Sequence, residues 1–144
     1  MSAIDLFSAE EQKRIVDAIR AAELNTSGEI RVHIEPICPE DNVLDRAVQV
    51  FYQLGMEKTE QQNGVLFYLA TDSRKFAVLG DKEMDKRVPE GFWESTKDLM
   101  RHHFRQGQFA EGFCRGIELA GQHLKQYFPR LSDDRNELSD ELSF

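Results

Sequence analysis

Oxygen-bearing side chains flank two apolar runs in the middle of the sequence. Asn63 shortly precedes the run at residues 65–70, and Asp81 follows the run at residues 75–79 after a single glycine. Carboxylate and amide oxygens are the ligands that Ca²⁺ and Mg²⁺ prefer in proteins. If the fold brings them together, these residues form a divalent-cation site, for calcium or magnesium, whose candidate ligands are Glu29, Asn63, Asp81, Glu83 and Asp85.

The same residues have a structural alternative. Asparagine favours turns and aspartate favours the N-cap of a helix whatever the function of a protein, so Asn63 could be a turn residue and Asp81 a cap. The acids from Asp81 onward do not continue as an EF-hand loop, which needs glycine at its sixth position and glutamate at its twelfth. Lys86 and Phe92 occupy those positions. The sequence therefore leaves both interpretations open.

A second candidate site lies between the two apolar runs. Asp72 and Arg74 could hold a substrate or an anion, since a guanidinium pairs well with phosphate and carboxylate groups. The alternative is a tight turn in which Asp72 caps the backbone, and we favour the turn.

The sequence carries no familiar signature of phosphoester hydrolysis by a protein nucleophile. Neither Cys38 nor Cys114 is followed by arginine six positions later, as in phosphatases that use a cysteine loop. The stretch from Asp72 to Arg74 lacks the second aspartate that an aspartyl-phosphate enzyme uses as acid or base. Hydrolysis would therefore have to be metal-assisted, with Asp81 and its neighbours as ligands.

Hydrophobic patterns predict the elements that position these residues. Residues 29–35 alternate strictly, and residues 65–70 are apolar on both faces, as in a strand covered by helices on both sides. An amphipathic helix at residues 44–54 separates them, and a right-handed crossover makes the two strands parallel. Residues 75–79 return antiparallel after the turn at residues 72–74. The expected sheet is mixed and mainly parallel.

This topology sorts the candidate residues to two edges of the sheet. The two parallel strands place Glu29 and Asn63 at the N-terminal edge, and the antiparallel strand brings Asp81 to the same edge, with Glu83 and Asp85 in the loop that follows. Asp72 lies at the opposite edge, where open parallel sheets usually bind their ligands. Asp72 and Asp81 therefore cannot be ligands of one ion.

Helices are expected before and after these strands. The stretch Ser8-Ala9-Glu10-Glu11 has the form of a capping box, which predicts a helix that ends near Glu23. From Val88 onward, apolar residues recur at helical spacing, with an interruption at Gly107 and an end at Pro129.

One domain and a short tail account for the length. A chain of 144 residues with 40% hydrophobic content suits a single core, which we assign to residues 1–129. Residues 130–144 are acidic and short of large core residues, so we expect a disordered tail, with Leu138 and Leu142 as its docking candidates.

The composition excludes several classes of function. A net charge of −8 without a dense basic stretch argues against general nucleic-acid binding and fits a cation or a basic partner better. No apolar run reaches the roughly 18 to 20 residues that a membrane span requires, and nothing at the N-terminus resembles a signal peptide. Cys38 and Cys114 lie far apart, which predicts two free thiols. We expect a cytoplasmic protein.

Several short motifs occur in a characteristic order along the chain. They are Phe7-Ser8-Ala9-Glu10-Glu11, Thr26-Ser27-Gly28-Glu29-Ile30-Arg31-Val32, Asn63-Gly64-Val65-Leu66, Asp72-x-Arg74, Gly80-Asp81 and Phe104-x-x-Gly107-x-Phe109-x-x-Gly112. Together they resemble the TPM domain, most closely its short, stand-alone bacterial members, from about Phe7 to Pro129. The resemblance implies a three-layer α/β/α sandwich, divalent-cation binding (calcium or magnesium) in some members, and acid phosphatase activity in relatives of the thylakoid lumen.

One stretch departs from that family's pattern. The membrane-anchored members usually carry Gly-Tyr-Gly, a hydrophobic residue and Glu after the second hairpin strand, whereas this chain has Gly80-Asp81-Lys82-Glu83-Met84. The roles of residues in that loop are therefore not carried over from the family.

Three functional hypotheses follow. The first is a small cytoplasmic module that binds a divalent cation and acts by binding or regulation. The alternatives are a metal-dependent acid phosphatase that acts on phosphoesters, and a scaffold whose acidic tail and Trp93 face dock a protein partner.

Overall fold

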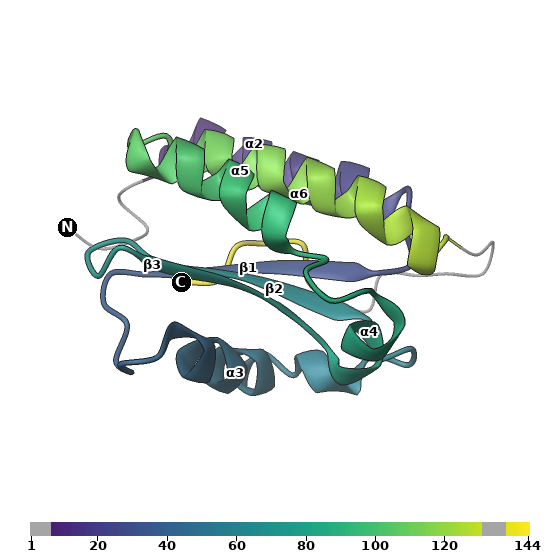
Figure 1. Cartoon of the computed structure of the whole chain (residues 1–144). Helices are drawn as coiled ribbons and strands as arrows, with labels where there is room; N and C mark the ends of the chain where they lie inside the picture. Colours follow the sequence, from purple (N-terminus) through teal and green to yellow (C-terminus); the bar gives the residue numbers. More distant parts are fainter. Residues whose placement is uncertain (1–6, 131–137) are drawn as a thin grey trace.

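The computed structural model of the chain describes residues 7–130 and 138–144. It is an α/β/α sandwich in which helices α2, α5 and α6 cover one face of the sheet and α3 lies on the other (Figure 1). This arrangement confirms the predicted fold class. The bounds of the elements are α2 Ala9–Glu23, β1 Glu29–Glu35, α3 Val43–Gln53, the 3₁₀ turn η1 Met56–Lys58, β2 Gly64–Ala70, β3 Lys75–Gly80, α4 Lys82–Arg87, α5 Glu94–Arg105 and α6 Phe109–Tyr127.

The sheet has the mixed topology that the sequence predicts. Its strand order is β1-β2-β3, with β1 parallel to β2 and β2 antiparallel to β3. In the register, Glu29 lies opposite Gly64, and Val65 lies opposite Gly80. The start of β1, the start of β2 and the end of β3 therefore share one edge of the sheet.

Two buried clusters hold the layers together. The larger cluster joins the face of the sheet that carries Ile30, Val65 and Phe67 to α2, α5 and α6. The smaller cluster joins Leu66 and Tyr68, on the opposite face, to α3 and η1. Because successive residues of β2 point into different clusters, its continuous apolar run needs a helical layer on each side.

The first helix begins as its sequence predicts. The Ser8 hydroxyl accepts a hydrogen bond from the Glu11 backbone N–H, and the Glu11 carboxylate accepts one from the Ser8 backbone N–H, both at 3.0 Å. This reciprocal pair is the capping box. Among the described residues, no helix has the length and apolar character needed to cross a membrane.

Residues 82–87 form the short helix α4 instead of the expected loop. Asp81 is its N-cap, its first turn carries Glu83 and Asp85, and its last turn carries Lys86 and Arg87. Acidic residues at the start of a helix and basic residues at its end both favour the helix dipole. Asp81 is therefore a helix N-cap, as the structural alternative predicts.

Part of the segment that we expected to be a disordered tail contacts the sheet. The Ile34 N–H donates to the Ser143 carbonyl and the Ser143 N–H donates to the Val32 carbonyl, each at 2.8 Å. Because β1 is an edge strand, its outer backbone groups have no strand partner within the sheet and are available to this segment. Leu138 and Leu142 also pack against the two buried clusters. Residues 131–137 lie outside the described part of the chain.

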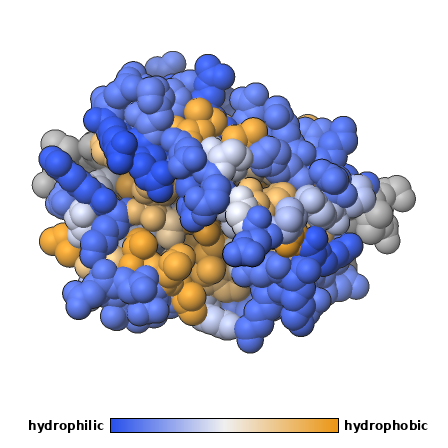
Figure 2. Space-filling model, in the orientation of Figure 1, coloured by the Kyte–Doolittle hydropathy of each residue, from blue (hydrophilic) through white to orange (hydrophobic). Residues whose placement is uncertain are grey.

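An apolar stripe lies on the outer face of α3. Leu44, Val48 and Tyr52 recur every fourth residue and are 41 to 49% exposed. Figure 2 shows an orange area on the otherwise largely hydrophilic surface in the region where Figure 1 places α3. Trp93 is instead partly buried against the larger cluster, so the exposed apolar side chains of α3 do not lie at the face that the scaffold hypothesis names.

Candidate functional sites

The N-terminal edge of the sheet carries three of the predicted cation ligands. The Glu29 N–H donates to the Asn63 carbonyl at 3.1 Å, and the Asp81 N–H donates to the Gly64 carbonyl at 2.9 Å. These backbone bonds tie the start of β1 and the end of β3 to the start of β2. The sequence therefore placed these residues at the correct edge.

Asn63 is buried and uses only part of its hydrogen-bonding capacity. Its Nδ2 donates to the Ser27 carbonyl at 2.7 Å. Its Oδ1 is buried and has no hydrogen-bond partner among the residues that the structure describes. Leaving a buried amide oxygen without a partner costs free energy. A hydrogen-bond donor or a cation that contacted this oxygen would therefore be bound favourably.

Asp81 shows the same incomplete satisfaction. Its Oδ1 accepts a hydrogen bond from the Lys82 N–H at 2.6 Å, whereas its Oδ2 is buried and finds no partner within the described segments. The residue is only 7% exposed. A cation close to the unsatisfied Oδ2 would supply the interaction that this oxygen lacks.

Asp85 adds a second carboxylate to this edge. Asp85 is an exposed residue, but partial burial of its carboxylate, together with the negative charge of Asp81, raises the pKa of Asp85 above its usual value. Asp85 Oδ1 lies against the backbone of Gly80, where an added Cβ would be only 3.2 Å from it. Asp81 and Asp85 thus repel each other, and a cation between them would relieve that repulsion.

Glu29 and Glu83 are engaged elsewhere. Glu29 Oε1 accepts a hydrogen bond from the Leu138 N–H at 2.8 Å, so this carboxylate holds the C-terminal segment. Glu83 lies on the exposed side of α4 and pairs with Lys86 at 3.1 Å. Within residues 7–130 and 138–144, no group of three or more His, Cys, Asp or Glu side chains is arranged to hold a metal ion, so a site here would need the amide oxygen of Asn63.

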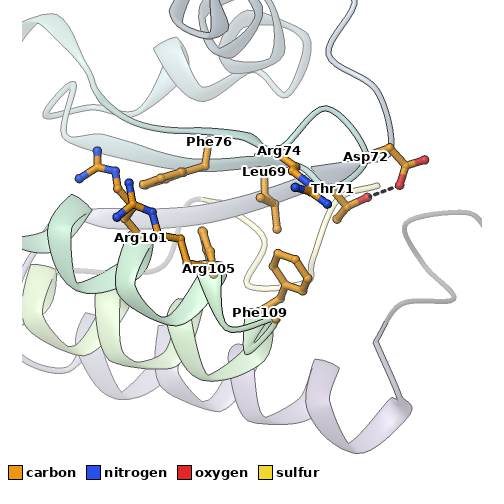
Figure 3. A pocket seen from close by; sticks show the side chains of 10 residues that line it. Leu69, Thr71, Asp72, Arg74, Phe76, Arg101, Arg105 and Phe109 are labelled. Carbon is orange, nitrogen blue, oxygen red and sulfur yellow. Dashed lines mark hydrogen bonds between the residues drawn. The ribbon is translucent and has the colours of Figure 1, made fainter.

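The opposite edge holds the turn that we favoured from the sequence. The N–H groups of Asp72 and Ser73 both donate to the Pro36 carbonyl, at 2.7 and 3.2 Å, and Arg74 has a positive φ of 56°. The Asp72 side chain is exposed and contacts the Thr71 hydroxyl at 3.5 Å. Asp72 is therefore a turn residue, and its carboxylate lies beside Thr71 and away from the arginines (Figure 3).

A cavity of about 700 Å³ lies beside this turn. Arg74 is joined there by Arg101 and Arg105, which come from the last turns of α5 (Figure 3). These two arginines were not predicted as site residues from the sequence. Their spacing of four residues does place them on one face of a helix, but nothing in the sequence indicated that this face meets the hairpin turn.

A partly buried polar network, which was not predicted from the sequence, lies between α3 and the sheet. Glu35 accepts two hydrogen bonds from the Arg46 guanidinium, both at 2.8 Å, and further ones from the Tyr68 hydroxyl and His33 Nε2. Burial opposes ionisation of Glu35, but the hydrogen bonds from Arg46, Tyr68 and His33 outweigh it and lower the pKa of Glu35 to about 2. His33 Nδ1 also contacts the Ser143 hydroxyl at 2.8 Å. The network joins β1, β2, α3 and the C-terminal segment.

Both cysteines are free thiols, as the sequence predicts. The Cys38 thiol donates to the Glu40 carbonyl at 3.2 Å. Burial raises the pKa of the Cys114 thiol, which keeps it protonated and unreactive at neutral pH.

Comparison with known proteins supports both the fold and the family. A family model described as the TPM domain matches residues 2–123. The NMR structure of the BA42 protein from the psychrophilic bacterium Bizionia argentinensis is 47% identical in sequence, with a TM-score of 0.89, and the match covers 95% of this chain and 94% of that one. No protein with a curated description matches the chain.

Two more distant structures share the fold alone. The N-terminal domain of a protein from P. gingivalis is 24% identical, with a TM-score of 0.70 over 85% of this chain and 79% of that one. The N-terminal domain of the cg2496 protein from Corynebacterium glutamicum is 15% identical, with a TM-score of 0.65 over 81% of this chain and 72% of that one. Since the family model spans most of the sequence, the chain belongs to the TPM domain family.

Proposed function

We propose that this chain is a cytoplasmic module that binds a divalent cation, calcium or magnesium, at the N-terminal edge of its sheet. Asn63, Asp81 and Asp85 would supply the protein ligands. The observation that supports the proposal is the pair of buried oxygens, Asn63 Oδ1 and Asp81 Oδ2, that have no hydrogen-bond partner within the described residues.

The chemistry of these donors suits a hard cation. Two carboxylates and one amide oxygen are the ligand types that Ca²⁺ and Mg²⁺ take, and waters would complete the coordination shell. A cation between Asp81 and Asp85 would also relieve their mutual repulsion, which adds to the effect of burial on the pKa of Asp85. Glu29 already accepts a hydrogen bond from Leu138 and Glu83 pairs with Lys86, so neither is needed as a ligand in this proposal.

A titration of Ca²⁺ and of Mg²⁺, followed by backbone amide NMR, tests the proposal. Shifts are expected at Asn63, Asp81 and Asp85, and Asp81→Asn should weaken binding by about tenfold or more because the site loses one charged ligand. Asparagine also serves well as an N-cap, so this variant should keep its fold. Asp17→Asn, an equal change on the exposed face of α2, is the matched control.

Two results would contradict cation binding at this edge. One is a spectrum without shifts around Asn63 and Asp81 at millimolar metal. The other is an Asp81→Asn protein that binds the metal as tightly as the original chain.

The arrangement gives less support to a metal-dependent phosphatase. The arginines and the acidic edge lie at opposite ends of β2, whose seven residues span about 20 Å. A phosphoester held by the arginines would therefore lie out of reach of a cation at Asp81. We adopt cation binding, without hydrolysis, as the proposed function.

A further inference from the structure

The cavity at the C-terminal edge of the sheet has the size of a small-molecule site. Its volume of about 700 Å³ falls within the range of roughly 300 to 1,000 Å³ typical of ligand pockets. It lies where β2 ends and beside the α5–α6 connection, at the edge that open parallel sheets use for ligands.

Aromatic side chains form the apolar wall of the cavity. The rings of Phe76 and Phe104 meet edge to face, with centroids 5.2 Å apart, and Phe104 is 5.6 Å from Phe109. Leu69 completes this wall (Figure 3). Such a surface would bury a flat apolar group by ring contacts as well as by loss of hydrated area.

Arginines supply the charge of the cavity. The Arg101 guanidinium lies 5.5 Å from the Phe76 ring centroid and pairs with Asp98 at 2.8 Å. The guanidinium groups of Arg74 and Arg105, by contrast, make no hydrogen bond or ion pair with any residue in the described part of the chain. In a chain with a net charge of −8, this is a local concentration of unneutralised positive charge.

The acid that lines the cavity does not offset this charge. Asp72 is exposed, its carboxylate contacts the Thr71 hydroxyl, and it points away from the arginines (Figure 3). Guanidinium groups with free N–H donors at the rim of an apolar cavity are suited to an oxyanion, which each can bind through two parallel hydrogen bonds.

The start of α6 adds to the positive potential. Gly107, in a left-handed conformation with φ 76°, ends α5 through hydrogen bonds from the Gly107 N–H to the Phe104 carbonyl and from the Gln108 N–H to the His103 carbonyl, both at 3.0 Å. The 19-residue α6 then begins at Phe109, in the cavity wall. The Gln108 side chain contacts His103 at 2.9 Å and does not cap α6, so the positive end of this helix lies beside the arginines without a side-chain cap.

We propose that this cavity binds a small aromatic oxyanion. The ring would lie against Phe76, Phe104 and Phe109. Its phosphate or carboxylate group would accept hydrogen bonds from Arg74 and Arg105. The site is separate from the proposed cation edge, so each can be present without the other.

Amide NMR titrations with three probes test this site. Phenyl phosphate and benzoate should shift the amides of residues 71–76 and 105–109 with a Kd of about 1 mM or tighter for at least one of them. Inorganic phosphate should bind at least about tenfold more weakly, because it lacks the ring. Tighter binding of phenyl phosphate would assign the site to phosphoesters, and tighter binding of benzoate would assign it to carboxylates.

Substitutions distinguish direct binding by the arginines from a general effect of the protein's charge. Arg105→Gln should weaken binding of the better aromatic probe by about tenfold, and Arg74→Asn should act similarly, since asparagine tolerates the left-handed backbone at that position. Lys125→Gln removes the same charge from the exposed face of α6 and should leave the affinity unchanged.

Three outcomes would overturn the proposal. They are the absence of shifts with both aromatic probes at about 10 mM, inorganic phosphate that binds as tightly as phenyl phosphate, and an Arg105→Gln protein with unchanged affinity.

Discussion

The buried carboxyl group of Glu23 provides a sharp test of the electrostatics of this fold. Glu23 closes α2, is 7% exposed, and accepts a hydrogen bond from the Ile30 N–H at 3.0 Å. Its carboxyl group also bonds to that of Asp140 in the C-terminal segment. Burial, followed by the bond to Asp140, raises the pKa of Glu23 from 4.5 to about 9, so the folded protein holds this group protonated at neutral pH.

The raised pKa of Glu23 determines the sign and size of its effect on stability as the pH changes. An unfolded glutamate ionises near pH 4.5, so Glu23 stabilises the fold fully below that pH, and this contribution is lost as the pH rises toward about 9. At pH 7, folding must return a proton to Glu23, at a cost of about 3 kcal/mol. Glutamine avoids this cost, because its carbonyl can still accept from Ile30 and its amide can donate to Asp140.

Glu23→Gln should therefore raise the free energy of unfolding at pH 7 by up to about 3 kcal/mol. The measurement is urea unfolding at pH 6, 7 and 8, where the gap between the variant and the original chain should widen by about 1.4 kcal/mol per pH unit. Glu118→Gln, on the exposed surface of α6, should show no such gap. A gap that stays constant with pH, or a Glu23→Gln protein that is less stable at every pH, would refute the reasoning.

Two further changes probe the packing and the polar network. Gly121→Ala should lower the free energy of unfolding by about 1 to 2 kcal/mol, since its new Cβ would lie 2.8 Å from the Ala22 Cβ and force α2 and α6 apart. Thermal or urea unfolding measures this loss, and Gln122→Ala, on the exposed side of the same helix, is the control. Glu35→Gln should cost about 2 to 3 kcal/mol at pH 7 by leaving the Arg46 charge unpaired. That loss should shrink as the pH falls from 4.5 toward 2, because Glu35 stabilises the fold only while its carboxylate is ionised. A loss that does not change with pH would contradict this account.

Local patterns predicted most of the fold because each long element carries its own period. The alternation in β1, the apolar run of β2 and the capping box at Ser8 each depend on residues close in sequence, and the crossover rule then gave the strand directions. The six-residue α4 is too short for a hydrophobic period. Its acidic first turn and basic last turn are nevertheless typical of the two ends of a helix, and this pattern could have distinguished α4 from a loop.

The C-terminal segment shows why the rest was not predictable. Residues 138–144 have no strand-like pattern of their own, and they lie on β1 because of what the rest of the chain provides. The outer edge of β1 offers backbone hydrogen bonds, Glu29 accepts from Leu138, and Arg20 pairs with Asp140 at 3.4 Å. Such contacts join residues 109 to 120 positions apart, so no local window of sequence contains them.

The two candidate sites were predictable to different degrees for the same reason. Asn63 and Asp81 border strands whose pairing follows from local rules, so the sequence could place them at one edge. Arg101 and Arg105 reach the opposite edge only because Gly107 ends α5 beside the hairpin turn, which is a matter of how helices are placed on the sheet. The position of a side chain at the end of a strand is therefore easier to predict from sequence than its contacts with an element far away in the chain.

The sheet thus separates two kinds of charge along its own length. Buried carboxylates lie at the start of β2 and arginines at its end, about 20 Å apart, which exceeds the screening length of roughly 8 Å at physiological ionic strength. A cation at one edge and an anion at the other would therefore gain little from direct attraction. Coupling between the two sites would have to pass through β2, whose residues are all buried between two packed clusters and have little freedom to move. On this arrangement the two sites should bind independently, and a cation should leave the affinity of the cavity for an aromatic anion nearly unchanged.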